Sequence, residues 1–481
     1  MVTDKTVTSQ DESRHWSYLY DLRGKLIKLN DPEQNMYSYT YDSLGNLVDV
    51  YQNGSHTTHN VYNGLSWNLE EVNVADNTRQ QYKYHRNGDV AVFTDKASQK
   101  HDYTYNEFDQ LTITVIYSRK GEVLYEDNRD YNKVTLLLER ESNSSGNSIE
   151  YGYDHFRRMN SQEVAGKTYA IQYQAGNEIN PYNINDLDDL MDGLTYSNGD
   201  KVSYTYDDLG RIKSVVKNQM KTVDYQYSSN SEGDTVTTFY RDEETGGKRV
   251  KQYRDSFGEL NQLLKPGSKA ENMTYDGFGN LATKESDGET WSYTYDKIDR
   301  LLTEESSTSN RKTVYEYDEK GNRKEVSDKE LPLPQENRSY EYDALNRLTK
   351  ASVGEDSYSY TYYPNGLSAT KEGGGDNTRY VYLNGHVIEE LDQSGKVKAM
   401  NVFGNEPLYR QTDDGQSGYF LNNYHGDVVS IVDKNWKVLN KYDYDVWGNP
   451  IEEKTTESMD NPFRYAGEVF DKETGYYYFC S

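Results

Sequence analysis

The chain has 481 residues, a formal net charge of -27 at pH 7 and a hydrophobic fraction of 34%, and 48 of its residues are tyrosine. The negative charge disfavours nucleic-acid phosphates and anionic membrane surfaces, so we expect no nucleic-acid partner. We expect no membrane span either, because no apolar run approaches the ~20 residues that a bilayer requires. Cys480 is the only cysteine, which excludes an internal disulfide framework and a cysteine-based zinc site.

The dominant pattern is the phrase Tyr-X-Tyr-Asp, which recurs at a step of about 21 residues. A fixed period of this length is typical of one supersecondary unit copied many times rather than of a single enzyme core. Incomplete copies, in which one or more residues of the phrase are replaced, lie between many of the complete or clean copies. The clean copies are Tyr18–Asp21, Tyr39–Asp42, Tyr151–Asp154, Tyr204–Asp207, Tyr293–Asp296, Tyr315–Asp318, Tyr340–Asp343 and Tyr442–Asp445.

One repeat near the N-terminus predicts a β-hairpin. Tyr37, Tyr39 and Tyr41 alternate with small polar residues, which is the period of a strand. Asp42 begins a turn in which Gly45 takes a positive φ, and Asn53-Gly54 predicts a second, tighter turn. We expect the fourth position of the repeat loop to accept only Gly, Asn or Asp, the residues that best tolerate the left-handed region. Because the repeats share this pattern, we predict an all-β fold of antiparallel β-hairpin repeats that pair edge to edge into one long ribbon. A broad curved sheet that is rich in tyrosine rather than in aliphatic side chains fits the composition.

Two stretches interrupt the repeats. The acidic segment Glu178–Asp192 lacks alternation and predicts an inserted loop with room for one helical turn, within an irregular insertion at about 174–203. The segment Glu330–Asn337 contains Pro332 and Pro334 and is expected to bulge from a strand connection.

Several residue patterns resemble sites, but simpler structural roles are favoured. Asp42, Asp207 and Asp296 recur once per repeat, so we interpret them as turn caps rather than cation ligands. His56 and His59 lie three residues apart beside a turn, with no carboxylate framing them as a metal site.

Two further patterns lie in the C-terminal third of the chain. His425 is expected to make a structural hydrogen bond, since no nucleophile neighbours it in sequence. Gly373-Gly374-Gly375-Asp376 lacks the lysine of a phosphate-binding loop and predicts a flexible hairpin tip. We therefore predict no catalytic, cofactor-binding or metal site.

The repeats and the C-terminal motifs resemble those of the Rhs/YD-repeat superfamily, with a partial Rhs-associated core. Among its members, the wall-associated polymorphic toxins of Gram-positive bacteria are the most similar in these motifs. The motifs that carry the resemblance are Tyr424–Ser430, Tyr442–Pro450, Asn461–Glu468 and Asp471–Tyr478.

The resemblance implies a repeat array at 1–411 and a partial core at 412–481. In the family, such hairpins enclose a C-terminal toxin, so the resemblance implies an all-β fold of antiparallel β-hairpin repeats coiled into an open, hollow shell-like spiral. An enclosed toxin polypeptide is the implied partner, and interbacterial competition is the implied role. The family's cores continue with an arginine and two aspartates that release the toxin, whereas this chain ends at Phe479-Cys480-Ser481. We therefore expect a truncated shell segment that lacks the toxin and is not an enzyme.

Two other functions stay open. Rows of tyrosine rings could bind carbohydrate, which makes a cell-wall or cell-surface adhesion module the main alternative. A nuclease or autoprotease comes third, because the acidic charge and the missing motif both oppose it. The resemblance implies a secreted or wall-associated location, although the opening Met1–Val7 does not predict a signal peptide, so a cytoplasmic orphan fragment is also possible.

Overall fold

The computed structural model describes most of the chain, and the structural statements below concern only this part. The described residues are 2–9, 12–173, 190–231, 233–240, 248–254, 259–264, 270–286, 288–308, 312–317, 323–326, 338–375, 377–423, 425–444 and 448–478. The predicted features at 178–189 and 330–337 lie outside them.

The chain divides into two compact units, each built from two separate segments. Unit 1 comprises Met1–Glu126 and Glu271–Leu333, and unit 2 comprises Asp127–Ala270 and Pro334–Ser481. The strands of unit 1 are β1 Asp4–Ser9, β2 Glu12–Tyr20, β3 Leu26–Asn30, β4 Met36–Tyr41, β5 Leu47–Gln52, β6 Ser55–Tyr62, β7 Asn68–Asn73, β8 Thr78–Tyr84, β9 Val90–Thr94, β10 Lys100–Tyr105, β11 Leu111–Tyr117, β24 Glu271–Tyr275, β25 Leu281–Ser286, β26 Glu289–Tyr295, β27 Leu301–Ser306, β28 Lys312–Tyr317 and β29 Arg323–Val326.

Strand β12, Val123–Tyr131, crosses from unit 1 into unit 2. The first segment of unit 2 continues with β13 Leu138–Asn143, β14 Ser148–Tyr153, β15 Met159–Val164, β16 Lys167–Tyr173, β17 Met191–Thr195, β18 Lys201–Tyr206, β19 Ile212–Lys217, β20 Met220–Asn230, β21 Gly233–Tyr240, β22 Lys248–Arg254 and β23 Leu260–Leu264.

The second segment of unit 2 carries the remaining strands and two 3₁₀ turns. They are β30 Arg338–Tyr342, β31 Leu348–Val353, β32 Asp356–Tyr362, β33 Ser368–Gly373, β34 Thr378–Leu383, β35 His386–Leu391, β36 Val397–Phe403, β37 Pro407–Thr412, β38 Ser417–Asn422, β39 Val428–Val432, β40 Val438–Lys441, η1 Glu452–Lys454, β41 Thr456–Glu457, η2 Tyr465–Gly467, β42 Val469–Asp471 and β43 Tyr476–Tyr478.

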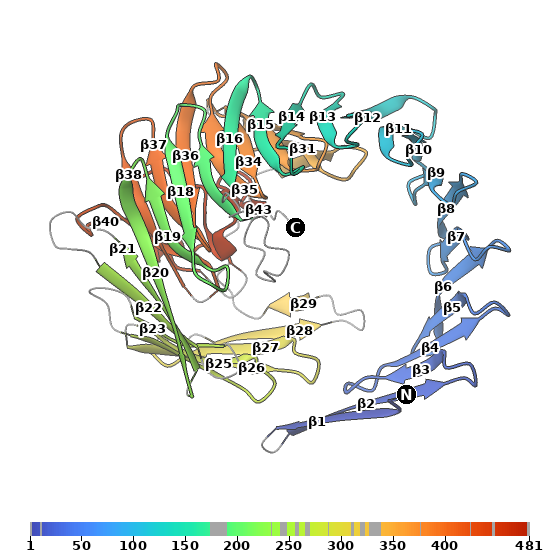
Figure 1. The fold of residues 1–481 in the computed structure, drawn as a ribbon. Helices are drawn as coiled ribbons and strands as arrows, with labels where there is room; N and C mark the ends of the chain where they lie inside the picture. The colour runs from blue at the N-terminus through green and yellow to red at the C-terminus, as the bar shows by residue number, and fades with distance from the viewer. Residues whose placement is uncertain are drawn as a thin grey trace. The chain divides into compact units, whose positions relative to one another are not determined.

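The described strands form three sheets, β1–β29, β30–β41 and β42–β43. Within a sheet, strands that follow one another in sequence pair as antiparallel neighbours, as the ribbon shows for β3 to β9 (Figure 1). In the repeat at 37–54, Tyr39 lies opposite Val50 and the register shifts at the turn. The tight turn at Asn53-Gly54 has positive φ at both residues, 49° and 82°, as a two-residue hairpin turn requires. The prediction of an all-β fold of antiparallel hairpin repeats is confirmed.

The second tyrosine of the repeat ties two strands together. In ten places its hydroxyl donates a hydrogen bond to the backbone carbonyl of the first residue of an earlier strand. In nine of them that strand immediately precedes the strand of the tyrosine, and in the tenth Tyr444, which follows β40, bonds to the first residue of β39. Two examples are Tyr41 to Leu26, at 2.8 Å, and Tyr105 to Val90, at 3.0 Å. The others are Tyr84 to Asn68, Tyr153 to Leu138, Tyr173 to Met159, Tyr206 to Met191, Tyr227 to Ile212, Tyr295 to Leu281, Tyr362 to Leu348 and Tyr444 to Val428.

The fourth residue of the common repeat loop takes the left-handed conformation, as predicted. Gly45 has φ 89°, Asp299 φ 67° and Asn346 φ 59°. The expected restriction to Gly, Asn or Asp at this position is wrong, because Arg157 (φ 69°) and Trp436 (φ 64°) also occupy it. Hydrogen bonds across the loop therefore outweigh the steric cost of a β-carbon there.

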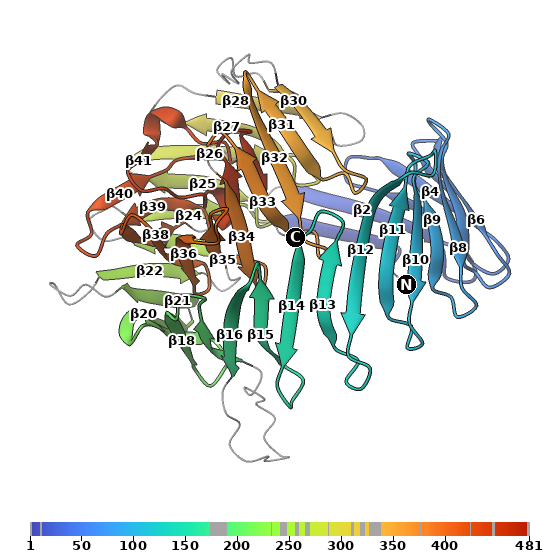
Figure 2. The ribbon, with the colours of Figure 1, turned by 90° about the horizontal axis from the view of Figure 1, so that it is seen from above.

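The two units bury their strands differently. In unit 1, strands such as β3 and β5 are half-buried at every position, as expected for a thin sheet with few aliphatic residues. In unit 2, the two segments face each other, and β16 and β18 lie against β34–β36 (Figures 1 and 2). Tyr169, Leu391 and Phe420 are 0% exposed there, so unit 2 contains a dry core that the composition did not predict.

Polar contacts join the two layers of unit 2. Gln162 donates to the carbonyl of Tyr382 at 2.9 Å, and Tyr196 donates to the carbonyl of Asn401 at 2.7 Å. The Tyr169 hydroxyl donates to Glu389 at 2.8 Å. The partners are about 200 residues apart in sequence, with separations of 220, 205 and 220.

The stretch expected to be irregular at about 174–203 is regular in its last part, while 174–189 lies outside the described residues. Regular strands already resume with β17 at Met191, and β18 begins at Lys201, because Leu194, Tyr196 and Val202 pack into the core of unit 2. The boundary between an array at 1–411 and a core at 412–481 stays a prediction. Within the described ranges, no helix is both long and apolar enough to cross a bilayer.

Candidate metal centre and C-terminal motif region

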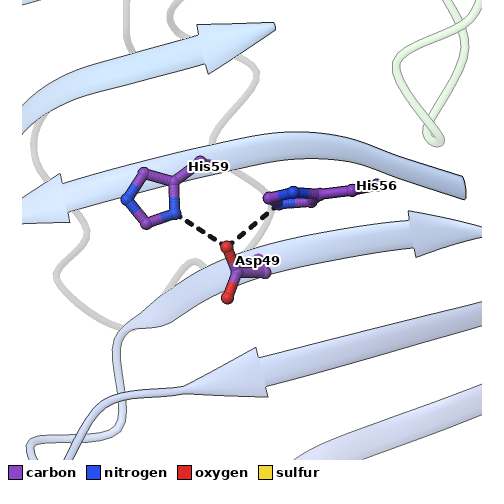
Figure 3. Close-up of side chains that lie close together, drawn as sticks. All are labelled: Asp49, His56 and His59. Atoms are coloured by element: carbon purple, nitrogen blue, oxygen red, sulfur yellow. Dashed lines mark hydrogen bonds and ion pairs between the residues drawn. The ribbon is translucent and has the colours of Figure 1, made fainter. Parts of the chain in front are cut away.

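Three side chains that could bind a metal ion converge on one face of the sheet in unit 1. Asp49 on β5 lies between His56 and His59 on β6 (Figure 3). Its Oδ1 atom is 3.0 Å from His56 Nε2 and 2.7 Å from His59 Nδ1. The side chains are 20%, 31% and 42% exposed, respectively, so solvent reaches the group.

A β-bulge places both histidines on the same face. In a regular strand, residues three apart point to opposite faces. Here Tyr51 lies opposite His56 and Val50 opposite Thr58, so Thr57 is the extra residue and Asp49 lies directly opposite His59. The Thr57 hydroxyl donates to the Val50 carbonyl at 3.0 Å, which holds the bulge in place.

Neighbouring side chains fix the orientation of the group. Thr40 on β4 donates a hydrogen bond from its hydroxyl to the other carboxylate oxygen of Asp49 at 2.7 Å. The Tyr51 ring stacks on His56 with centroids 4.6 Å apart. Burial raises the pKa of Asp49, but hydrogen bonds from His59 and Thr40 outweigh it and lower the pKa below its usual value. Asp49 therefore offers a negative charge to the two imidazoles.

The expectation that no carboxylate frames His56 and His59 is wrong. Two imidazoles and one carboxylate are ligands that suit zinc and other divalent transition metals. The signal that could have been found in the sequence is the Asn53-Gly54 turn, which folds β6 back along β5 and brings Asp49 near His56. The bulge that adds His59 has no such signal.

The repeat aspartates cap their own turns, as predicted. The Oδ1 atom of Asp207 accepts the backbone N–H groups of Leu209 and Arg211, both at 3.0 Å. The Arg211 side chain and these N–H groups lower the pKa of Asp207 below its usual value. Asp42 and Asp296 accept equivalent bonds from Asn46 and Arg300. Their carboxylates are engaged within single loops and do not converge into a shared site.

The C-terminal motif region of unit 2 is held by buried hydrogen bonds. His425 contacts Asp427 through Nδ1 at 2.8 Å, and this bond raises the pKa of His425. Asp427 also accepts the backbone N–H of Ala466 at 2.7 Å and the side-chain amide of Asn423 at 2.6 Å. His425 thus makes the expected hydrogen bond, and its structural role stays a prediction.

The last described hairpin, β42–β43, is joined to earlier strands by Asp471. Tyr360 donates to Asp471 at 2.5 Å and Lys371 at 2.9 Å, and Lys371 also contacts Glu473. Although burial raises the pKa of Asp471, bonds from Glu473, Lys371 and Tyr360 lower it to about 2. The group is an ion pair that holds the hairpin in place.

The remaining predicted sites are also accounted for. Gly373, Gly374 and Gly375 have positive φ and lie at the tip between β33 and β34, as a hairpin tip requires, while Asp376 lies outside the described residues. Cys480 lies outside them too. A cavity of about 180 Å³ between the layers of unit 2 is smaller than the ~300 Å³ or more of ordinary ligand pockets.

Comparison with known proteins supports the repeat interpretation. The family model described as Teneurin YD-shell matches residues 247–480. The tRNA3(Ser)-specific nuclease WapA of Bacillus spizizenii is 29% identical over 351 residues, which cover 65% of this chain and 14% of that protein. The tRNA(Glu)-specific nuclease WapA of Bacillus subtilis subsp. natto is 32% identical over 228 residues, which cover 46% of this chain and 8% of that protein. The chain thus spans a small part of these relatives.

Solved structures share the fold. Two crystal structures, of TcdB2-TccC3-TEV and of TcdB2-TccC3-Cdc42, both align with a TM-score of 0.67 over 98% of this chain and 29% of the solved chain, at 13% and 14% identity. The repeat chemistry, the family model and the WapA relatives agree with one another. The chain therefore carries YD repeats, resembles the YD-shell family over its C-terminal part, and has nucleases of the WapA type among the proteins it is similar to.

Proposed function

We propose that the chain is part of the wall of a shell that encloses a polypeptide in a toxin-related protein used in competition between bacteria. In this proposal the chain is a container and does not itself catalyse a reaction. The observation that carries the proposal is the alignment of 98% of the chain, at a TM-score of 0.67, with TcdB2-TccC3 structures. The family model, described as a YD-shell, supports the same role.

The engagement of the repeat residues supports a structural role. The second tyrosines donate their hydroxyl groups to neighbouring strands, and the aspartates cap their own loops. A wall built this way maintains its curvature and spacing without a catalytic centre. The nuclease activity in the names of the WapA relatives belongs to proteins of which this chain spans 14% or less, so we assign it to other parts of those proteins.

A protection experiment on the full-length protein that contains this chain tests the proposal. Limited proteolysis of the native protein should spare the polypeptide inside the shell, and the same polypeptide, expressed alone, should be digested. Equal digestion of the enclosed and isolated polypeptides would refute encapsulation. Cleavage of tRNA by the purified 481-residue chain would refute the non-catalytic role.

Carbohydrate binding and a secreted or cell-wall-associated location stay predictions. The relatives of the WapA type support such a location for the full-length protein. Saturable binding of the chain to purified cell wall, lost when exposed ring faces are removed, would favour an adhesion module instead. The tyrosine hydroxyls already engaged within the sheet give that alternative less support.

A further inference from the structure

We propose that Asp49, His56 and His59 bind a divalent transition metal ion of the Zn²⁺ class on the sheet of unit 1. The proposal does not depend on the shell function, because it rests on the geometry of one hairpin. Hard cations such as Ca²⁺ and Mg²⁺ fit less well, since they prefer all-oxygen ligands. Two imidazole nitrogens and one carboxylate oxygen match the ligand preference of Zn²⁺.

The distances between the ligand atoms fit a small adjustment on binding. Ligands bound at ~2.0–2.1 Å in a tetrahedral site lie about 3.4 Å apart. The two imidazole nitrogens here are 3.0 and 2.7 Å from Asp49 Oδ1, so each of these two separations must lengthen by less than an ångström. All three ligand atoms lie within 4.8 Å of one another, which brackets the separation required. Rotation about the side-chain bonds of His56 and His59 supplies that movement without changing the strand register.

The surroundings prepare the carboxylate for a cation. Thr40 fixes one oxygen of Asp49 and leaves the other directed at the histidines. Such a second-shell hydrogen bond is a usual feature of metal sites. The net charge of -27 also raises the local concentration of cations around the protein.

The site has three protein ligands and is partly exposed, which leaves a fourth position for water or for a donor from another molecule. A metal ion here would join β5 to β6 beyond the Asn53-Gly54 turn. Hydrogen bonds alone also hold Asp49, His56 and His59 in this arrangement, so the test measures metal binding directly.

The test uses the full chain without an affinity tag, stripped with a chelator and titrated with Zn²⁺ by calorimetry. We expect one Zn²⁺ per chain, and we expect Co²⁺ to give the visible absorption of a low-symmetry site. Asp49→Asn, His56→Gln and His59→Gln should each abolish stoichiometric binding. Thr40→Val should weaken affinity about tenfold, because it loses only the second-shell bond.

Two control variants separate this site from general histidine affinity. His15→Gln removes a histidine whose Nε2 lies 3.5 Å from Asp4 and whose Nδ1 lies 3.0 Å from the Thr6 hydroxyl, and this variant should bind Zn²⁺ as the unaltered chain does. Exchanging two neighbours, Thr58→His with His59→Thr, keeps the composition but moves the imidazole to the position opposite Val50, on the other face of the sheet. This exchange should abolish binding.

The proposal is overturned if the unaltered chain binds no stoichiometric metal, or if the exchanged variant binds as tightly as the unaltered chain. Circular dichroism and thermal unfolding without metal establish that each variant is folded. A bulge-removing deletion of Thr57 gives a further check. It leaves His56 and His59 two residues apart on one face, so we expect the deletion variant to retain binding, and loss of binding in a folded deletion variant would contradict the geometry.

Discussion

At the residue scale, the second tyrosine of the ten repeats in which its hydroxyl bonds an earlier strand explains why this chain needs so few aliphatic side chains. Its ring packs within the sheet and its hydroxyl satisfies a backbone carbonyl on the neighbouring strand, so one residue provides both apolar area and a directed bond. Burial raises the pKa of these hydroxyls, as it does for Tyr41 and Tyr105 and, to about 12, for Tyr295. The hydroxyls are therefore uncharged donors at neutral pH.

Removing one such hydroxyl should weaken the sheet measurably. Tyr41→Phe loses the bond to the Leu26 carbonyl, and we expect the free energy of unfolding to fall by about 1 kcal/mol. The matched control is Tyr39→Phe, on the same strand, because its hydroxyl makes no hydrogen bond to any described residue. It should cost less than about 0.5 kcal/mol. Urea unfolding measures both, and equal costs would contradict the role given to the second tyrosine.

At the scale of the element, the repeat loop combines a capping side chain with one residue in the left-handed conformation. Gly366, in the loop between β32 and β33, has φ 89° and open space around its α-carbon. A substitution there tests backbone conformation alone, because no neighbouring atom would clash with a β-carbon.

Gly366→Ala should destabilise the chain by about 1–2 kcal/mol, since an alanine in the left-handed region pays a steric cost. Gly366→Asn should cost clearly less, because asparagine tolerates this region. Thermal unfolding of the two variants measures the difference. Gly121→Ala, at a loop of unit 1 that also has open space and a φ of 87°, is the corresponding control and should behave like Gly366→Ala. An alanine variant as stable as the asparagine variant would refute this explanation of the loop.

At the scale of the whole molecule, the main division is between the thin sheet of unit 1 and the two-layered unit 2. Glu389 lies between the layers, is 0% exposed and accepts bonds from Tyr169 and Ser197, both at 2.8 Å. Burial raises the pKa of Glu389, and the two hydrogen bonds offset only part of the rise. A raised pKa in the folded state stabilises unit 2 fully below the unfolded value of about 4.3, and this contribution is lost as the pH rises through the folded pKa.

Two substitutions at Glu389 separate hydrogen bonding from charge. Glu389→Ala leaves the buried Tyr169 hydroxyl and the half-buried Ser197 hydroxyl without their acceptor and should cost about 2–3 kcal/mol. Glu389→Gln keeps an acceptor and cannot ionise, so its stability relative to the unaltered chain should improve between pH 4.5 and pH 8. Urea unfolding at both pH values checks this. A relative stability of Glu389→Gln that does not change with pH would contradict the raised pKa.

The sequence by itself determined the hairpin repeat, its turns and the roles of its aspartates. These features rest on contacts within about 20 residues of chain, such as Asp207 capping Arg211 and Tyr41 bonding Leu26. Local contacts of this kind follow from residue type and spacing, which are legible in the sequence. The C-terminal motifs were equally informative, because four stretches of sequence together resemble the motifs of the Rhs/YD-repeat superfamily.

Only the tertiary structure decided the dry core of unit 2 and the group around Asp49. Tyr169 and Glu389 meet across 220 residues of sequence, and no spacing rule connects residues so far apart. His59 joins Asp49 and His56 because Thr57 forms a bulge, which reverses the face of every later side chain on the strand. A one-residue irregularity leaves almost no trace in composition or period, yet it decides which side chains meet.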